Sequence, residues 1–238
     1  MVDPYAAIAD FYDAEFEGLT ADAAFFARIA APGPLLVIGC GTGRVSSLLA
    51  AGRRVTGLDR TEGMLARARA RHDGVTYVQA DMRDFSLGTY GEILLPNAAL
   101  CFLHGRADPL ACLSACARSL APGGALTLDL PAPDFALYGV RHTPERVAWE
   151  GPVGGRAGRR SREVTRRAIF GRVDLLDRYW LDGEFVGSSL LALQLATPRE
   201  VEWLCETAGF WVDTMYGDYA GGPLRDGCPR IIVRAFRC

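Results

Sequence analysis

Short apolar runs alternate with helical stretches between residues 34 and 130. The runs predict buried strands at 35–38, 54–59, 75–78, 92–95 and 125–130. Apolar residues at helical spacing predict helices between them, two of which end near Gly52 and Gly74. This alternation builds a parallel sheet covered by helices, so we predict an α/β fold with a doubly wound, mainly parallel sheet. Its ligand site is expected at the carboxyl ends of the strands.

The alternation breaks after Pro131. Proline and glycine are dense from 131 to 158, where we expect loops with little regular structure. Strand-like segments follow at 163–170, 172–181 and 185–195, and Asp182-Gly183 is a strong hairpin signal. These segments predict a small antiparallel β insertion that stands over the strand ends.

The last part of the chain returns to the main sheet. A capping box at 197–200, with Pro198 in the first turn, predicts a helix that ends before Gly209. Segments 211–216 and 229–236 predict two closing strands, which brings the sheet to seven strands. The expected domains are a main domain, residues 1–139 plus 197–238, and the insertion, residues 140–196, as a substrate lid or a dimer contact.

Composition narrows the class of protein. The chain has 238 residues, of which 50% are hydrophobic and 23% charged, the balance of a compact globular protein. All 26 basic residues other than histidine are arginine, which excludes chemistry that requires a lysine amine. A net charge of −2 gives no global reason to expect nucleic acid as a partner. No window approaches the ~20 apolar residues of a membrane span, so we predict a cytoplasmic protein.

Cysteine and histidine suggest no further cofactor. The seven cysteines are irregularly spaced, and we interpret them as buried thiols in a reducing compartment. His72, His104 and His142 lie far apart in the sequence without the spacing of a zinc motif, so no metal site is predicted.

A glycine-rich loop follows the first strand and opens a helix. Gly39, Gly41 and Gly43 allow a tight turn and close approach of the backbone to a ligand. Asp59 ends the second strand, at the distance where a carboxylate reaches ribose hydroxyls. Arg44 stands where the dinucleotide fingerprint requires its third glycine, so a nicotinamide or flavin cofactor is less favoured than another nucleoside cofactor.

Four motifs carry a resemblance to a known family. They are residues 37–44 (VIGCGTGR), 55–59 (VTGLD), 81–85 (DMRDF) and 120–124 (LAPGG). With them the chain resembles the class I S-adenosylmethionine-dependent methyltransferases, in particular the small-molecule group that includes sugar N,N-dimethyltransferases. The resemblance implies a Rossmann-like fold, S-adenosylmethionine as cofactor, a small-molecule acceptor and a homodimer.

The resemblance also implies the cofactor-binding residues. They are Tyr12, Gly39, Cys40, Gly41, Gly43, Asp59, Arg60, Met64, Asp81, Met82, Pro96 and Asn97. The glycine loop would pack against the methionine part of the cofactor, and Asp59 would bind the ribose. Tyr5 and Tyr12 resemble aromatic residues of a helix that closes over the cofactor, or are ordinary core aromatics.

Further roles follow for the adenine and methionine ends of the cofactor. Arg60 and Met64 would flank the adenine. Asp81 would accept a hydrogen bond from the adenine amino group, and the backbone N–H of Met82 would donate to the ring. Residues 96–97, just past the fourth strand, would contact the methionine part.

The acceptor atom decides whether a base is needed. An amine has only to arrive neutral, whereas a hydroxyl benefits from a base within hydrogen-bond reach. We predict His104, Asp129 and Tyr216 as the catalytic candidates, with His142 and Asp218 as further candidates by location. Some sugar N-methyltransferases carry a histidine where this chain has Phe102. His104 as a surface or helix-start residue, and Asp129 in a turn, are the structural alternatives.

The insertion is rich in arginine and aromatic residues. Six arginines between 156 and 167 could hold a phosphate or carboxylate of the substrate, or form a solvated strand face. Tyr138, Trp149, Tyr179 and Trp180 could line an acceptor pocket or pack in a core.

We therefore predict methyl transfer from S-adenosylmethionine to an N or O atom of a small molecule by in-line displacement. The alternatives are an NAD(P)-dependent oxidoreductase on a related fold and a cofactor-binding protein without turnover.

Overall fold

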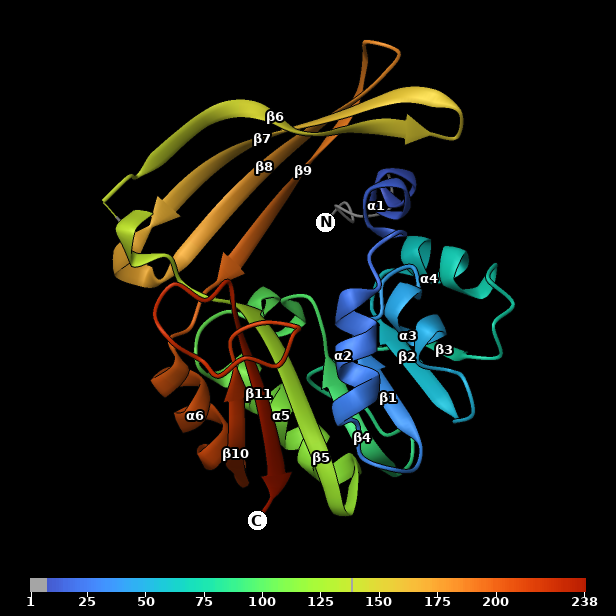
Figure 1. Cartoon of the computed structure of the whole chain (residues 1–238), viewed down its shortest axis with the longest axis vertical. Coiled ribbons are helices and arrows are strands. Elements are labelled where there is room, and N and C mark those ends of the chain that lie inside the picture. Colours follow the sequence, from blue (N-terminus) through green and yellow to red (C-terminus); the bar gives the residue numbers. More distant parts are fainter. Residues whose placement is uncertain (1–7, 138) are drawn as a thin grey trace.

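The computed structural model describes residues 8–137 and 139–238, which form two β-sheets (Figure 1). Tyr5 and Tyr138 lie outside the described residues. The main sheet has seven strands in the order β10-β11-β5-β4-β1-β2-β3. They are β1 Leu35–Ile38, β2 Val55–Asp59, β3 Thr76–Gln79, β4 Tyr90–Leu95, β5 Leu120–Pro131, β10 Phe210–Tyr216 and β11 Arg230–Arg237.

The pairing of these strands confirms a doubly wound, mainly parallel sheet. β11 is antiparallel to β5 and β10, and β1, β2, β3, β4 and β5 pair in parallel. The strand order reverses between β1 and β4. This switch point is where sheets of this class bind ligands, beyond the carboxyl ends of the strands.

Helices cover both faces of the sheet because both faces of β1 are apolar. Leu35 and Val37 pack in one cluster with α2, α3 and α4, whereas Leu36 and Ile38 pack in another with α5 and α6. The helices are α1 Ala9–Phe16, α2 Ala21–Ile29, α3 Arg44–Leu48, α4 Glu62–Arg69, α5 Ala107–Ser119 and α6 Pro198–Thr207, with 3₁₀ turns η1 Ala99–Phe102, η2 Phe135–Leu137 and η3 Ala168–Phe170.

The predicted capping box starts α6. The Glu200 N–H donates to the Thr197 hydroxyl at 3.3 Å, and the Thr197 N–H donates to the Glu200 carboxylate at 2.7 Å. β5 begins earlier than predicted, at Leu120 in place of residue 125. α1 and α2 are elements that the hydrophobic pattern did not predict.

The second sheet is antiparallel, in the order β6-β7-β8-β9. Its strands are β6 His142–Val153, β7 Arg156–Arg167, β8 Arg172–Leu181 and β9 Glu184–Gln194. Figure 1 shows it beyond the carboxyl ends of the main-sheet strands, with α1 between it and the helices α3 and α4. The insertion therefore stands over the strand ends, as predicted.

The prediction of loops from 131 to 158 is wrong, because β6 and the start of β7 occupy most of this segment. Pro144 and Pro152 fit because β6 is an edge strand, where a missing N–H need not cost a ladder bond. Gly154 and Gly155, with φ of 58° and 82°, form the two-residue turn of the β6–β7 hairpin.

In the part of the chain that the structure describes, no helix is long and apolar enough to cross a membrane. The cytoplasmic location stays a prediction.

Candidate functional site

The glycine loop between β1 and α3 lies at the switch point of the sheet. Gly39, Gly41 and Gly43 have φ of 69°, 55° and 85°, a region that favours glycine. A Cβ at Gly39 would stand 2.8 Å from the Cβ of Ala99, and one at Gly43 would stand 2.4 Å from the Tyr77 hydroxyl oxygen. A Cβ at Gly41 would enter open space. Gly39 and Gly43 therefore pack against protein, and Gly41 is the position open to a ligand.

Asp59 holds this loop from the end of β2. Its Oδ2 accepts from the Gly41 N–H at 2.8 Å, and its Oδ1 accepts from the Thr61 N–H at 2.9 Å. Each carboxylate oxygen can accept a second hydrogen bond. The carboxylate is thus oriented next to the open position, where it can bind vicinal hydroxyls of a ribose.

Cys40 fills space beneath the loop. It is 8% exposed, and its Sγ would lie 2.9 Å from a Cβ at Gly57. Burial, with a contribution from the Asp59 charge, raises the pKa of the Cys40 thiol. The thiol is therefore neutral, and a cofactor-binding role of Cys40 stays a prediction.

Tyr12 reaches the same region from α1. Its ring centroid is 4.9 Å from that of Phe16. Burial raises the pKa of the Tyr12 hydroxyl, on which the charges of Arg44, Asp22 and Asp59 also act. Helix α1 thus faces the loop and the carboxylate of β2.

The predicted adenine contacts follow β2 and β3. Arg60 is exposed directly after β2, and Met64 on α4 is 3% exposed. Asp81 is held by Arg83, whose Nε and Nη2 donate to Oδ1 at 3.0 Å and to Oδ2 at 2.6 Å. These hydrogen bonds lower the pKa of Asp81. Met82 packs against the main core cluster, and the adenine roles of these residues stay predictions.

Pro96 and Asn97 follow β4 on the other side of the switch point. Asn97 has a φ of 51°, and its N–H donates to Oδ2 of Asp129 at 2.9 Å. The turn therefore presents exposed Asn97 next to the glycine loop, in the position predicted to contact the methionine part of a cofactor.

Asp129, at the end of β5, is 1% exposed and accepts three hydrogen bonds. Besides the Asn97 N–H, it accepts from the Tyr219 hydroxyl at 2.9 Å and from Arg230 Nε at 2.5 Å. These three donors, one of them an arginine, orient the carboxylate. Its contacts thus fit the positioning of the β4 turn better than proton transfer.

The other two catalytic candidates lie apart from Asp129. Tyr216, at the end of β10, packs edge-on against Phe25 with ring centroids 5.2 Å apart. Nε2 of His104 lies 3.0 Å from the carbonyl oxygen of Ala192 on β9, so His104 joins the main domain to the insertion. Tyr216 and Asp129 both pair with Ile232 of β11 and therefore stand two strands apart.

An ion pair that the sequence did not predict lies under the loop. Arg44 donates to both carboxylate oxygens of Asp22 on α2, at 3.0 and 2.5 Å, and to the carbonyl oxygen of Leu19. Both side chains are 5% exposed. Burial opposes ionisation of Asp22, but Arg44 outweighs it and the pKa of Asp22 is lowered. Only the atypical Arg44 at the helix start was a sequence signal for this contact.

These features fit S-adenosylmethionine. The open space at Gly41 would let the methionine part of the cofactor approach the backbone closely. The Asp59 carboxylate next to it could accept hydrogen bonds from the ribose hydroxyls. The residues that would hold the cofactor are the glycine loop, Asp59, Met64 and Asn97. In the described ranges, no group of three or more His, Cys, Asp or Glu side chains is placed to hold a metal ion.

Comparisons with known proteins agree with this class of site. A family model described as methyltransferase domain matches residues 36–128. A trans-aconitate 2-methyltransferase of Methylobacterium nodulans is 37% identical over 149 residues, which cover 61% of this chain and 56% of that protein. The chain thus matches little more than half the length of this relative.

Two matches extend over nearly the whole chain. The cypemycin N-terminal methyltransferase of a Streptomyces species is 30% identical over 229 residues, 89% of this chain and 88% of that protein. The SAM-bound structure of CalS10, an amino pentose methyltransferase from Micromonospora echinaspora, is 26% identical with a TM-score of 0.71, covering 94% of this chain and 91% of that chain.

The sheet and the glycine loop define a Rossmann-like fold of the kind found in class I methyltransferases. The chain belongs to the S-adenosylmethionine-dependent methyltransferases. The family favours methyl transfer over the NAD(P)-dependent alternative.

Proposed function

We propose that this protein transfers a methyl group from S-adenosylmethionine to the amine nitrogen of a small molecule. Two relatives that match about nine tenths of the chain support this choice of acceptor, since by their names one is an N-terminal methyltransferase and the other an amino pentose methyltransferase. The trans-aconitate relative matches only 61% of the chain.

The observation that favours nitrogen over a hydroxyl oxygen is the engagement of Asp129. A hydroxyl acceptor benefits from a base, but the Asp129 carboxylate already accepts from Asn97, Tyr219 and Arg230. His104 is likewise turned to a backbone carbonyl of β9. A neutral amine attacks without a protein base and loses its proton afterwards, which is compatible with these contacts.

The roles of the residues follow from their positions. When bound, S-adenosylmethionine supplies an electrophilic methyl carbon on a sulfonium. Asp59 and the Gly41 backbone would hold the cofactor, and Asn97 would orient its methionine part. The insertion would place the amine in line with the carbon–sulfur bond and exclude water. Alignment of this kind can lower the barrier of such a displacement by about 7–11 kcal/mol.

Methylation of a carboxylate oxygen is the second candidate, favoured by the 37% identity to trans-aconitate 2-methyltransferase over the cofactor-binding part. A homodimer, predicted from the resemblance, is proposed for the assembly.

A matched substrate panel tests the acceptor class. The full chain is incubated with S-adenosylmethionine and either amines (amino sugars and short peptides) or carboxylic acids including trans-aconitate. Mass spectrometry should show the added methyl group on an amine, and His104→Gln should keep the rate. Products only among the acids would overturn the amine assignment. Tight cofactor binding with no product in either panel would favour the binding protein without turnover.

A further inference from the structure

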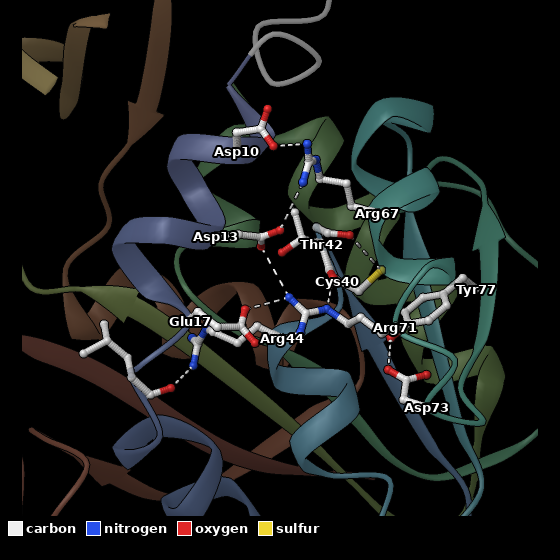
Figure 2. Close-up of polar contacts among 12 residues, drawn as sticks. Asp10, Asp13, Glu17, Cys40, Thr42, Arg44, Arg67, Arg71, Asp73 and Tyr77 are labelled. Atoms are coloured by element: carbon white, nitrogen blue, oxygen red, sulfur yellow. Dashed lines mark hydrogen bonds and ion pairs between the residues drawn. The ribbon is translucent and has the colours of Figure 1, made fainter. Parts of the chain in front are cut away.

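Arg71, just past the end of α4, joins the glycine loop to helix α1 (Figure 2). Its Nε donates to the carbonyl oxygen of Thr42, inside the loop, at 2.6 Å. Its Nη1 and Nη2 donate to the two Glu17 carboxylate oxygens at 2.9 and 2.8 Å. Nη2 also lies 3.3 Å from Oδ1 of Asp13. One guanidinium thus contacts the loop and two acidic side chains from the N-terminal helix region.

A second arginine, one turn earlier on α4, also pairs with acidic residues of α1. Arg67 pairs with Asp10 and lies 3.9 Å from Asp13. Asp10 and Asp13 lie on α1 and Glu17 directly follows it, at a spacing that places the three carboxylates along one side. Arg67 and Arg71 are four residues apart. Figure 2 shows these side chains converging between the two helices. We call these five residues the latch.

Another side of α1 contacts the insertion. The ring centroids of Phe11 and Tyr179 are 4.9 Å apart. Arg160 of β7 donates to the Glu15 carboxylate at 2.9 and 2.6 Å. Helix α1 therefore lies between the insertion and the cofactor loop.

The latch is only partly buried. The Arg71 and Glu17 side chains are 20% and 54% exposed, in contrast to 5% for each partner of the Arg44–Asp22 pair. Exposed pairs are weak and are screened by salt. The pKa of Glu17 is lowered by the hydrogen bonds from Arg71, so Glu17 stays charged at neutral pH. The latch is thus formed at rest and can open.

We propose that Arg71 is a positioning residue that couples the glycine loop to α1, so that opening of the latch gates release of S-adenosylhomocysteine. The Arg71–Thr42 bond holds the loop, and the Arg71–Glu17 and Arg71–Asp13 contacts hold the helix over it. The proposal rests on the placement of the cofactor at the glycine loop.

The release rate of the product tests the gate. Radiolabelled S-adenosylhomocysteine is bound to the full chain, and its dissociation is followed after excess unlabelled ligand is added, at low and high salt. The rate in the parent should rise with salt. Arg71→Met should release the ligand about tenfold faster at low salt. Glu17→Gln keeps the Thr42 contact and should lower the salt dependence, because it removes the bidentate Arg71–Glu17 pair.

Arg69→Met is the matched control. Arg69 lies on α4 and pairs with Glu62 of the same helix at 2.5 Å, without contact to α1 in the described pairs. The Arg69→Met variant should release S-adenosylhomocysteine at a rate within about twofold of the parent. Rates for Arg71→Met and Glu17→Gln within about twofold of the parent, with unchanged salt dependence, would overturn the gate. Unfolding temperatures show whether a variant is folded.

Amide hydrogen exchange in α1 of the ligand-free protein gives a second readout. Exchange should rise in Arg71→Met and not in Arg69→Met, since the latch holds this helix. Equal exchange in both variants would contradict the latch even where ligand release changes. Unchanged affinity for S-adenosylhomocysteine in a folded Asp59→Ala variant, by contrast, would contradict the cofactor placement and not the latch.

Discussion

Gly39, Gly41 and Gly43 share a left-handed backbone but differ in what surrounds them. Neighbouring side chains occupy the space beside Gly39 and Gly43, whereas the space beside Gly41 is open. The G-x-G-x-G pattern located the loop but could not rank its members, because the difference comes from Ala99 and Tyr77, which are distant in the sequence.

Gly41→Ala should weaken S-adenosylhomocysteine binding by about tenfold or more, because the new Cβ stands where the backbone approaches the ligand. Calorimetric titration measures the affinity. Gly52→Ala is the control, since Gly52 has a φ of 74° with open space beside it and lies in the turn after α3. Both variants carry the left-handed strain of about 1–2 kcal/mol. Equal affinities in the two variants would show that Gly41 does not face the ligand.

Single residues explain which site predictions could be made. Asp59 was found because it is the last residue of a strand that the pattern identifies, twenty residues after Gly39. Asp22, Tyr219 and Arg230 were missed because their partners, Arg44 and Asp129, are brought to them by folding. The acidic residues at helical spacing between 10 and 17, and the arginines at 67 and 71, could have predicted ion pairs between these two segments. Composition alone does not show this pattern.

Helices α2 and α3 are joined by the buried Arg44–Asp22 pair, which fixes the N-terminal helices to the cofactor loop. Asp22→Asn leaves the Arg44 charge without its partner, so we expect a loss of about 3 kcal/mol in the free energy of unfolding near neutral pH. Urea denaturation measures this loss.

The pH dependence of that loss follows from the lowered pKa of Asp22. A carboxyl whose pKa is lower in the folded state stabilises the fold above its unfolded pKa, with a reference value of 3.8. The contribution disappears as the pH falls through the folded value. The difference between parent and Asp22→Asn should therefore be constant above about pH 5 and shrink below about pH 4. A difference that persists unchanged at low pH would contradict an ionic origin.

Elements with a strong pattern were predicted correctly, and the others were not. β1 is buried on both faces and α6 carries its own capping box, so local sequence suffices. β6 was missed because its prolines indicate loops unless the strand is known to lie at an edge. α1 is short and gains its stability from the insertion and α4, contacts that the hydrophobic pattern does not contain.

The two sheets and α1 together support the proposal of a cofactor site at the switch point and an acceptor site under the insertion. The doubly wound, mainly parallel sheet of seven strands followed from the sequence pattern and the resemblance. The way in which α1 connects the insertion to the glycine loop did not, because it depends on ion pairs between residues up to 145 positions apart.

Calorimetric titration of the full chain with S-adenosylhomocysteine, in the parent and in Asp59→Ala, tests whether the cofactor lies at the glycine loop. Loss of the Asp59 hydrogen bonds should cost roughly 1.5–3 kcal/mol, a tenfold to hundredfold weaker affinity, in a variant that remains folded. NAD, titrated in parallel, should give no signal. Equal affinity of the parent and a folded Asp59→Ala for S-adenosylhomocysteine, or binding of NAD alone, would contradict this site.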